Sequence, residues 1–359
     1  MQKFSLPPRV HGGRPGIRGS LFEHSAISGV ENLPWYHARP ICRSSLKSAD
    51  VVWSMTSKGA YENPDARDGV ITGLIAYTSW GFMPIYFKFV SAVPVTEVLA
   101  HRIVWAVPFG ALIICARRQW PEVRRVLTHK VMLFWLCVAA LFVAVNWLMY
   151  IIAVQRNEIF QASLGYYINP LMYVVVGVMF LGERLHGLQI AAVLSATIGV
   201  LILTFSGGEF PAIALTLAFS FTIYGVIRKK VVVGGMPGLF VETLVLSPIA
   251  LIWLIWLIQS NQPSFGTGDL GLSALLILAG PLTVIPLLCF ALAARRLPLT
   301  TIGFMQFIAP TLHFLVGLYY GEQLTTPHLI CFILIWIAVG LFSADALRAN
   351  RGRTVAPIR

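Results

Sequence analysis

The chain has 359 residues, of which 57% are hydrophobic and only 12% are charged. Soluble domains carry about 25% charged residues, so this composition excludes an ordinary soluble protein. The net charge of +12 and the pI of 9.8 do not indicate nucleic-acid binding, because the basic residues lie in short clusters between apolar runs. Basic loops beside long apolar runs are instead typical of integral membrane proteins.

Residues 1–68 form a polar segment rich in Gly, Pro, Arg and Ser, without periodicity. The segment lacks the apolar stretch of about 7–15 residues that a cleavable signal peptide needs, and we predict a disordered tail. Met55 begins the compact polar sequence MTSKGAYENPDARDGV, so Met55 is an alternative natural start of the protein.

Ten apolar runs follow, and each is long enough to cross a hydrocarbon core about 30 Å thick as a helix of about 20 residues. Each run must be helical, because hydrocarbon offers no water to an open backbone. We therefore predict an all-α integral membrane protein. The runs lie at about 69–89, 95–116, 131–153, 159–181, 187–206, 211–228, 238–259, 270–292, 299–320 and 327–346.

Basic residues occupy every second connection between the runs. They concentrate after the second, fourth, sixth and eighth runs and in the tail at 347–359, whereas the other connections are nearly bare. Because basic loops stay in the cytoplasm, both termini are predicted to be cytoplasmic.

An offset of 140 residues brings similar residues of the two halves into register. One residue of slippage then aligns LGERL at 181–185 with YGEQL at 320–324. We predict two repeats of five helices, 69–206 and 211–346. Because five is odd, the second copy enters the membrane from the opposite side, as in many secondary transporters. The matched pairs are Arg102 and Glu242, Pro108 and Pro248, Ala139 and Ala279, Tyr150 and Phe290, Arg156 and Arg296, and Pro170 and Pro310.

The second run begins with three ionisable residues, Glu97, His101 and Arg102. Arg102 is expected about 10 Å inside the hydrocarbon at 1.5 Å per residue, where a charge needs a partner or a cavity. Trp105 offers a ring for its guanidinium, and His101 shares another helix face with Glu97. Two interpretations stay open: a snorkelling arginine beside a helix end, or an anion or substrate contact beside a titratable histidine.

The repeat places Arg102 in the outer half and Glu242 in the inner half. We expect two polar sites at opposite ends of one cavity rather than an ion pair. The alternative for Glu242 is an interfacial carboxylate near the start of its helix.

Pro170 and Pro310 remove helical hydrogen bonds from the carbonyls of Tyr166 and Gln306. Such carbonyls must be covered by neighbours or line a wet cavity. With Asn169 beside Pro170, we expect a cavity wall here; a packed structural kink is the alternative.

The other candidate residues complete this set. The dipeptides Gly182-Glu183 and Gly321-Glu322 close the fourth and ninth runs and are expected to terminate helices rather than bind ligands. The cavity candidates are His101, Arg102, Tyr166, Asn169, Glu242 and Gln306, with Trp80, Trp105, Asn146, Tyr150 and Tyr224 as weaker candidates.

Motifs for enzymes and metal sites do not occur. The sequence has no HExxH, P-loop or GxSxG motif and no paired intramembrane aspartates, and its five cysteines form no CxxC. No catalytic residue, metal or cofactor is expected. The competing hypotheses are a membrane-embedded enzyme acting on a lipid-linked substrate and a structural or signalling membrane protein.

Several segments are more specific than hydropathy requires, and they carry a resemblance. They are EVLAHRIVWA, NWLMYIIAV, ASLGYYINPL, FTIYGVIRKK, VETLVLSP and GPLTVIPLLCFALAARRLPLTTIGFMQFIAP. On these segments the chain resembles the RarD proteins of the EamA branch of the drug/metabolite transporter (DMT) superfamily. The resemblance covers 69 to about 346 and implies ten helices in two EamA halves in a bacterial inner membrane.

Residues and resemblance together predict a secondary transporter that moves a small metabolite or drug by alternating access. The expected partners are an unidentified small-molecule substrate and membrane lipids, with no nucleic acid. A coupling proton stays open, with His101 as its candidate carrier because an imidazole titrates near neutral pH. The resemblance leaves the substrate undefined.

Overall fold

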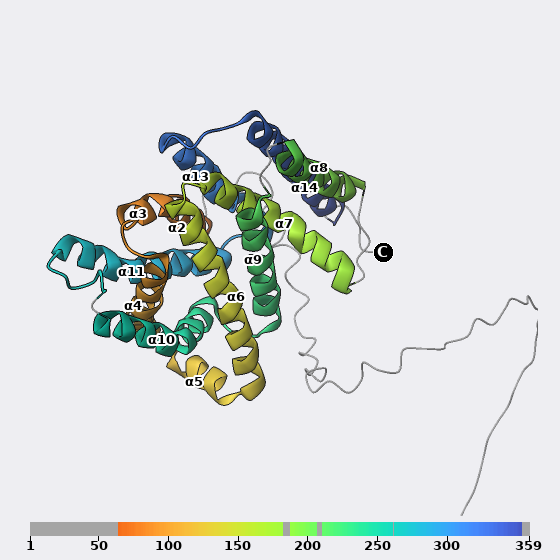
Figure 1. The fold of residues 1–359 in the computed structure, drawn as a ribbon. Coiled ribbons are helices and arrows are strands. Elements are labelled where there is room, and N and C mark those ends of the chain that lie inside the picture. Colours follow the sequence, from red (N-terminus) through yellow and green to blue (C-terminus); the bar gives the residue numbers. More distant parts are fainter. Residues whose placement is uncertain (1–63, 182–186, 207–209, 261, 354–359) are drawn as a thin grey trace, which may run out of the picture. The chain divides into compact units, whose positions relative to one another are not determined.

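The structure is a computed structural model that describes residues 64–181, 187–206, 210–260 and 262–353 (Figure 1). Within these ranges every regular element is an α-helix. Met55, nearly all of the predicted tail and the dipeptide Gly182-Glu183 lie outside the described residues. The helices are α2 (Pro64–Gly81), α3 (Met83–Phe89), α4 (Val95–Ala116), α5 (Trp120–Thr128), α6 (Lys130–Gln155), α7 (Ile159–Leu181), α8 (Gly187–Ser206), α9 (Ala212–Lys230), α10 (Gly235–Gln259), α11 (Leu270–Ala294), α12 (Leu299–Met305), α13 (Ile308–Tyr319) and α14 (Thr326–Arg353).

The prediction of an all-helical membrane protein is confirmed. Nine segments of the described residues are long and apolar enough to cross a membrane. Helix α7, with 23 residues, occupies the fourth predicted run and completes the set of ten positions. The predicted runs match helices to within a few residues at most ends, because the hydrocarbon requirement and the helix requirement coincide.

The two repeat-related prolines act differently. Pro310 follows a break at Gln306 and Phe307 that separates α12 from α13, as expected when the proline ring opposes the carbonyl four residues earlier. Helix α7 instead continues through Pro170. The first run is also split, between α2 and α3, with Pro84 in the first turn of α3.

The basic connection after α4 contains a helix that hydropathy did not predict. In α5, Val123 and Val126 are buried while Arg124 and Arg125 are exposed. The short helix is therefore amphipathic and packs against α6 and α10.

Three pairs of helices begin at the predicted offset. Helices α4 and α10, α6 and α11, and α7 and α12 begin 140 residues apart, at Val95 and Gly235, Lys130 and Leu270, and Ile159 and Leu299. The N-cap residues of α6 and α11 share this offset, because His129 accepts from the amide of Met132 and Asp269 from that of Leu272.

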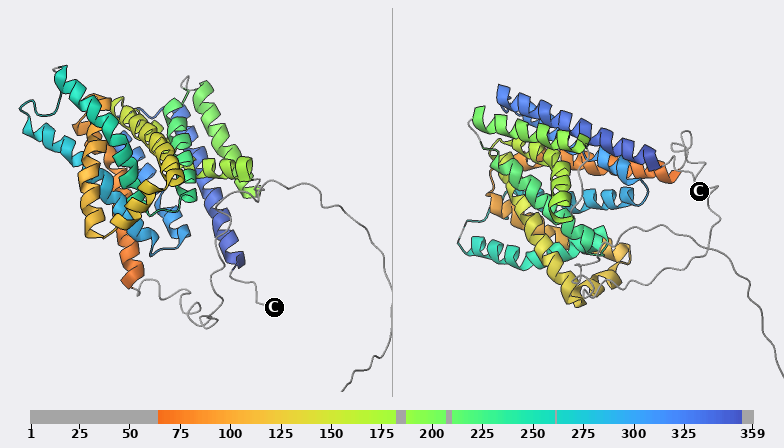
Figure 2. Two further views of the ribbon diagram at one scale, coloured as in Figure 1. Left: turned by 90° about the horizontal axis from the view of Figure 1, so that it is seen from below. Right: turned by 90° about the vertical axis from the view of Figure 1, so that its right-hand side faces the viewer.

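The packing of the helices is reciprocal between the halves. Helix α4 packs on its counterpart α10, α7 on α13, and α8 on α14, whereas α2 packs on α11 just as α6 packs on α9. Figures 1 and 2 show α8 and α14 side by side. Such reciprocal contacts are those of two halves related by an approximate two-fold axis.

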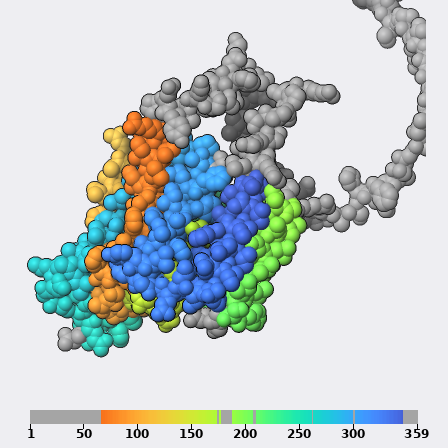
Figure 3. Space-filling view, turned by 90° about the horizontal axis from the view of Figure 1, so that it is seen from above, coloured from red at the N-terminus to blue at the C-terminus, as the bar shows by residue number. Residues whose placement is uncertain are grey.

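Large apolar side chains cover outward surfaces. On α8, Leu194, Ile198 and Phe205 are exposed, Phe205 by 81%. Figure 3 shows α8 in green beside the blue C-terminal helices on one such face. An exposed apolar surface of this extent is unsuited to water and suited to lipid.

Gly280 lets the backbones of α11 and α4 approach closely, since a Cβ added there would lie 2.5 Å from the carbonyl oxygen of Trp105. We expect Gly280→Ala to destabilise the protein by about 1–3 kcal/mol, the usual cost of overpacking. Gly340→Ala on α14, where nothing lies within 4 Å of the added atom, is the control and should be neutral or slightly stabilising. Thermal unfolding in detergent checks the pair, and equal effects would contradict this packing.

Candidate functional site

Arg102 lies in the interior of the helical bundle, with 6% of its surface exposed. Its Nε donates to Thr283 Oγ1 of α11 at 2.9 Å. The guanidinium carbon lies 4.3 Å from the ring centre of Trp147 on α6 and 5.7 Å from that of Phe87 on α3. Within the described residues no carboxylate forms an ion pair with Arg102. A buried cation thus rests on aromatic faces and one hydroxyl.

Trp105 does not stack on Arg102, so that expectation is wrong. Its Nε1 donates to Nδ1 of His101 at 3.2 Å, because the two residues share one face of α4. The predicted shared face of His101 and Glu97 is confirmed by a 3.9 Å separation between Nε2 and Oε1.

Glu97 holds the loop after α10. Its carboxylate accepts from the amide of Ser264 at 2.7 Å, from the hydroxyl of Ser264 at 2.8 Å and from the amide of Phe265 at 3.3 Å. The ring of Phe265 also lies against His101. His101 therefore faces a structural carboxylate and a loop, whereas the neighbouring Arg102 faces the interior.

A second group of polar side chains is connected to Arg102 through an aromatic ring. Phe87 meets the ring of Tyr150 edge-on. The Tyr150 hydroxyl lies 2.8 Å from Nε2 of His313 on α13, and this nitrogen lies 3.0 Å from the carbonyl oxygen of Trp80. The other ring nitrogen of His313 is buried and has no hydrogen-bond partner in the described residues.

Asn146 joins three helices in the interior. Its amide nitrogen donates to the carbonyl of Leu217 at 3.0 Å and to the hydroxyl of Ser220 at 3.2 Å, both on α9. Its side-chain oxygen accepts from Tyr166 of α7 at 3.1 Å. The ring of Tyr166 in turn contacts that of Tyr150. The hydrogen bonds fix the orientation of the asparagine amide.

Glu242 has a partner in its own half of the chain. Its Oε1 lies 3.5 Å from Nε of Arg228, and its Oε2 accepts from the hydroxyl of Tyr224 at 3.2 Å. Glu242 has no exposed surface, whereas the Arg228 side chain keeps 14% of its own. The Arg228 guanidinium lies over Gly238, where an added Cβ would meet it at 1.9 Å.

The two charged groups are linked by aromatic rings. Tyr166 contacts Phe221, and Phe221 contacts Tyr224, which donates to Glu242. Together with the Phe87, Tyr150 and Tyr166 contacts, these rings form an unbroken series from Arg102 to Glu242. We call this series of residues the aromatic track: Arg102, Trp147, Phe87, Tyr150, His313, Tyr166, Asn146, Phe221, Tyr224 and Glu242.

Three further sequence candidates lie outside the track. Asn169 is tied to α9, because its side-chain oxygen accepts from Thr222 at 2.7 Å. The ring of Trp80 packs on Tyr77 and Phe290. Gln306 is half-buried at the break between α12 and α13.

Sequence reasoning missed several members of this arrangement. Trp147, Thr283 and Phe87 carry no sequence signal as neighbours of Arg102, since they come from other helices. His313 did carry one, because it is a titratable residue inside an apolar run. Arg228, at the basic end of the sixth predicted run, was not among the candidate residues.

Gly321 and Glu322 end α13, as predicted. Gly321 has a positive φ of 77°, and the amide of Glu322 donates to the carbonyl of Gly317. The Glu322 carboxylate also has an unpredicted role, because its two oxygens accept from the amide of Phe160 at 3.0 and 3.1 Å. Glu322 therefore caps the N-terminus of α7, the helix that carries Tyr166.

Burial raises the pKa of Glu322 to about 7, against the opposing effects of the α7 amides and Lys88. A raised carboxyl pKa means that the folded state binds more protons, so its contribution to stability falls as the pH rises from about 4.5 to about 7. Glu322→Gln removes this titration. We expect the wild type to lose thermal stability relative to Glu322→Gln across that interval, measured by unfolding at a series of pH values; parallel curves would contradict the assignment.

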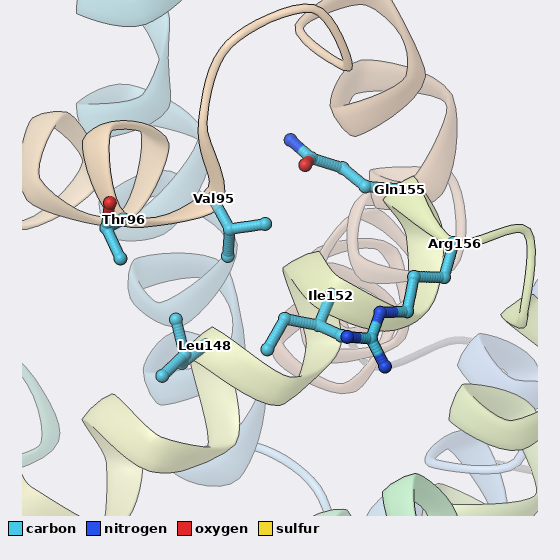
Figure 4. A pocket seen from close by; sticks show the side chains of 6 residues that line it. All are labelled: Val95, Thr96, Leu148, Ile152, Gln155 and Arg156. Carbon is cyan, nitrogen blue, oxygen red and sulfur yellow. The ribbon is translucent and has the colours of Figure 1, made fainter.

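Two surface hollows are called outer and inner after the orientation predicted from the basic connections, and the inner one lies at α5 and the end of α9. The outer hollow, of about 470 Å³, is formed where α4 begins and α6 ends, and Arg156 is the one charged residue among its described lining residues (Figure 4). The inner hollow, of about 490 Å³, contains Arg228 and further basic residues. Arg102 lines neither hollow. The outer lining is Val95, Thr96, Leu148, Ile152, Gln155 and Arg156, and the inner lining is Glu122, Arg125, Arg228, Lys229, Val231, Val232, Val233 and Gly234.

Comparisons with known proteins agree with this architecture. Residues 67–205 match the EamA-like transporter family. Protein RarD of Salmonella typhimurium is 44% identical, and that of Escherichia coli K12 is 42% identical, each over 79% of this chain and 97% of the relative. An uncharacterized transporter of Vibrio cholerae is 46% identical over 80% of this chain and 96% of its own length. A solved crystal structure, 19% identical, shares the fold with a TM-score of 0.52 over 78% of this chain and 97% of its own.

Proposed function

The chain belongs to the EamA-like transporter family, in its RarD group, and we propose that it is a secondary transporter that moves a small organic molecule across the bacterial inner membrane by alternating access. Membership makes it a multi-pass membrane transporter of the DMT type. The substrate, the driving gradient and the mechanism of access belong to the proposal.

The observation that carries the proposal is a polar, aromatic-lined series of residues buried between two related halves. Arg102 and Glu242, at the two ends of the aromatic track, occupy equivalent positions of the repeat. In transporters built from inverted repeats, substrate sites lie at the interface of the halves, and one half rocks against the other around the site. Reciprocal packing of α4 on α10 and α7 on α13 supplies such an interface.

The competing hypothesis is a membrane-embedded enzyme acting on a lipid-linked substrate. The three relatives named above include a protein described as a transporter and none described as an enzyme. The track consists of aromatic rings, His313, Asn146 and one charged group at each end, an arrangement suited to holding a ligand. A transporter therefore explains both the relatives and the site.

The alternating basic connections predict the orientation of the chain. Reporter fusions after Lys130, Lys230 and Arg353 should report the cytoplasm, and fusions near Asn261 and Thr325 the external side. The result is read as paired alkaline phosphatase and fluorescent-protein activities. An external signal at Lys230 would contradict both the orientation and the inversion of the halves.

Transport can be tested with an undefined mixture of candidate substrates. Purified protein is reconstituted into proteoliposomes, which are incubated with a bacterial metabolite extract and analysed by untargeted mass spectrometry. We expect at least one small compound to be enriched over protein-free vesicles without ATP. If no compound is enriched over protein-free vesicles, the result would count against transport.

A further inference from the structure

We propose that the Arg102 end of the aromatic track binds the oxyanion group of a small organic anion, whose apolar body lies among the rings of Trp147, Phe87 and Tyr150. The inference rests on the proposed transport function and names the substrate class of the same site. It comes from the charge of Arg102, from the repeat and from the charges at both ends of the pathway.

The charge of Arg102 is not neutralised by the protein in the described residues. The guanidinium has five N–H donors, and the hydrogen bond described for it uses Nε alone. A buried charge is normally paired. Trp147 compensates part of the charge through its ring face, but it supplies no acceptor in the plane of the guanidinium. The in-plane donors therefore suit a ligand with oxygen acceptors.

Comparison of the two halves shows that, among the described residues, the buried charge lacks an oppositely charged partner in the first half and not in the second. In the second half Glu242 pairs with Arg228, 14 positions earlier in the sequence. At the 140-residue offset the counterparts are Arg102 and Lys88, so the position that would complete the pair holds a second cation.

Lys88 has partners of its own. Its ammonium is hydrogen-bonded to Asn157 and lies 5.4 Å from the ring centre of Tyr320. In the second half of the protein the buried charge is neutralised by an internal ion pair. In the first half the buried cation is left for an external anion.

Both ends of the pathway have the charge that this substrate class requires. Arg156 is the one charged residue among the described residues that line the outer hollow. Besides Arg228, which pairs with Glu242, the inner hollow is lined by Arg125 and Lys229 against one acid, Glu122, whose carboxylate already accepts from the amide of Gly234 at 2.7 Å. Basic clefts raise the local concentration of anions.

The geometry of the guanidinium defines the ligand group further. Its planar fork of donors matches carboxylate, sulfonate and phosphate oxygens in pairs, which an ammonium does not. The rings of Trp147 and Phe87 lie beside the guanidinium, and the ring of Tyr150 packs edge-on against Phe87. An aromatic or otherwise planar body attached to an oxyanion satisfies both surfaces.

The test uses three probes of similar size: benzenesulfonate, neutral benzenesulfonamide and cationic phenyltrimethylammonium. Full-length protein in phosphatidylcholine nanodiscs is titrated with each probe, and the apparent Kd is taken from the shift in Tm. We expect benzenesulfonate to raise Tm and the other two probes to have much smaller effects. Arg102→Gln should raise the Kd for benzenesulfonate about tenfold or more, the effect of losing one charge-assisted interaction.

Two further variants keep the outcome decisive. Arg124→Gln removes an exposed guanidinium outside the track and should leave the Kd unchanged. Arg102→Lys keeps the charge without the planar fork and should weaken binding while preserving the preference for the anion, even if Arg102→Gln does not fold. The proposal would be overturned if the three probes gave equal responses or if the protein preferred the cation. It would also be overturned if the substitutions of Arg102 left the benzenesulfonate response unchanged.

A lipid phosphate has the same chemistry as a soluble oxyanion, and a second arm separates them. Replacing part of the phosphatidylcholine with anionic phosphatidylglycerol should leave the benzenesulfonate Kd within about twofold after salt is matched. A large rise in Kd would assign the site to a lipid headgroup and overturn the proposal.

The two proposals fail separately. Enrichment of only cations or neutral compounds from the extract would leave transport standing and overturn the anion assignment. Arg102-dependent binding of benzenesulfonate without enrichment of any compound would leave the anion site standing and count against transport.

Discussion

Arg102→Gln is expected to reduce uptake of transported compounds by at least about tenfold while leaving insertion into the membrane intact. The reduction follows from losing a charge-assisted contact, which contributes about 1.5–3 kcal/mol. Insertion is preserved, because α4 remains apolar and the loop charges still set orientation. The measurement is initial uptake into proteoliposomes containing equal amounts of folded wild-type and variant protein.

Arg156→Gln is the comparison variant at the outer hollow. Arg156 is exposed and lies in the outer hollow, so its charge acts on approach rather than on binding. We expect a modest reduction in uptake that disappears at high salt, because salt screens exposed charges. Full activity of Arg102→Gln would show that the buried Arg102 takes part in packing and not in transport.

Breaking the pair between Arg228 and Glu242 is expected to have the largest effect on stability. Arg228→Met leaves the fully buried Glu242 carboxylate with only the Tyr224 hydroxyl, at a cost of about 3–5 kcal/mol. Glu242→Gln should cost less, because Arg228 keeps partial exposure and contacts the carbonyl oxygens of Gly234 and Gly235. The double variant should recover much of the loss. The free energy of unfolding of all four proteins forms the double-mutant cycle.

A second cycle distinguishes the true partner of Glu242. Arg102 and Glu242 occupy equivalent repeat positions, yet they form no ion pair in the described residues. The effects of Arg102→Gln and Glu242→Gln on unfolding should therefore add. A coupling above about 1 kcal/mol in this cycle, or additivity in the Arg228 cycle, would contradict the assigned pairing.

The positions of the helices follow from physical requirements that a sequence shows directly. A run of apolar residues in hydrocarbon has to be a helix, so α4 and α8 match their predicted ranges end for end. Whether the helix continues or breaks at Pro170 and Pro310 does not follow from the sequence in this way. Both prolines remove the same local hydrogen bond, and the neighbours that pack around each site decide whether the helix continues. The amphipathic α5 was missed because the prediction relied on long apolar runs.

The charged residues of the site, like the positions of the helices, could be identified from physical requirements that a sequence shows directly. Arg102 and Glu242 are conspicuous in apolar runs and require partners. The identity of those partners depends on contacts between helices. Trp105 lies three residues from Arg102 in sequence, but Trp147 on α6 supplies the ring face. Such contacts between helices are set by tertiary packing, to which a single sequence gives no direct access.

The most direct test of the account is counterflow of the compound most strongly enriched from the metabolite extract. Proteoliposomes are loaded with the unlabelled compound and diluted into a trace of the labelled one, without ATP. We expect transient accumulation of label in wild-type vesicles and in Arg124→Gln vesicles, and none in Arg102→Gln vesicles. Absence of accumulation with the wild type, or equal accumulation with Arg102→Gln, would contradict a secondary transporter organised around Arg102.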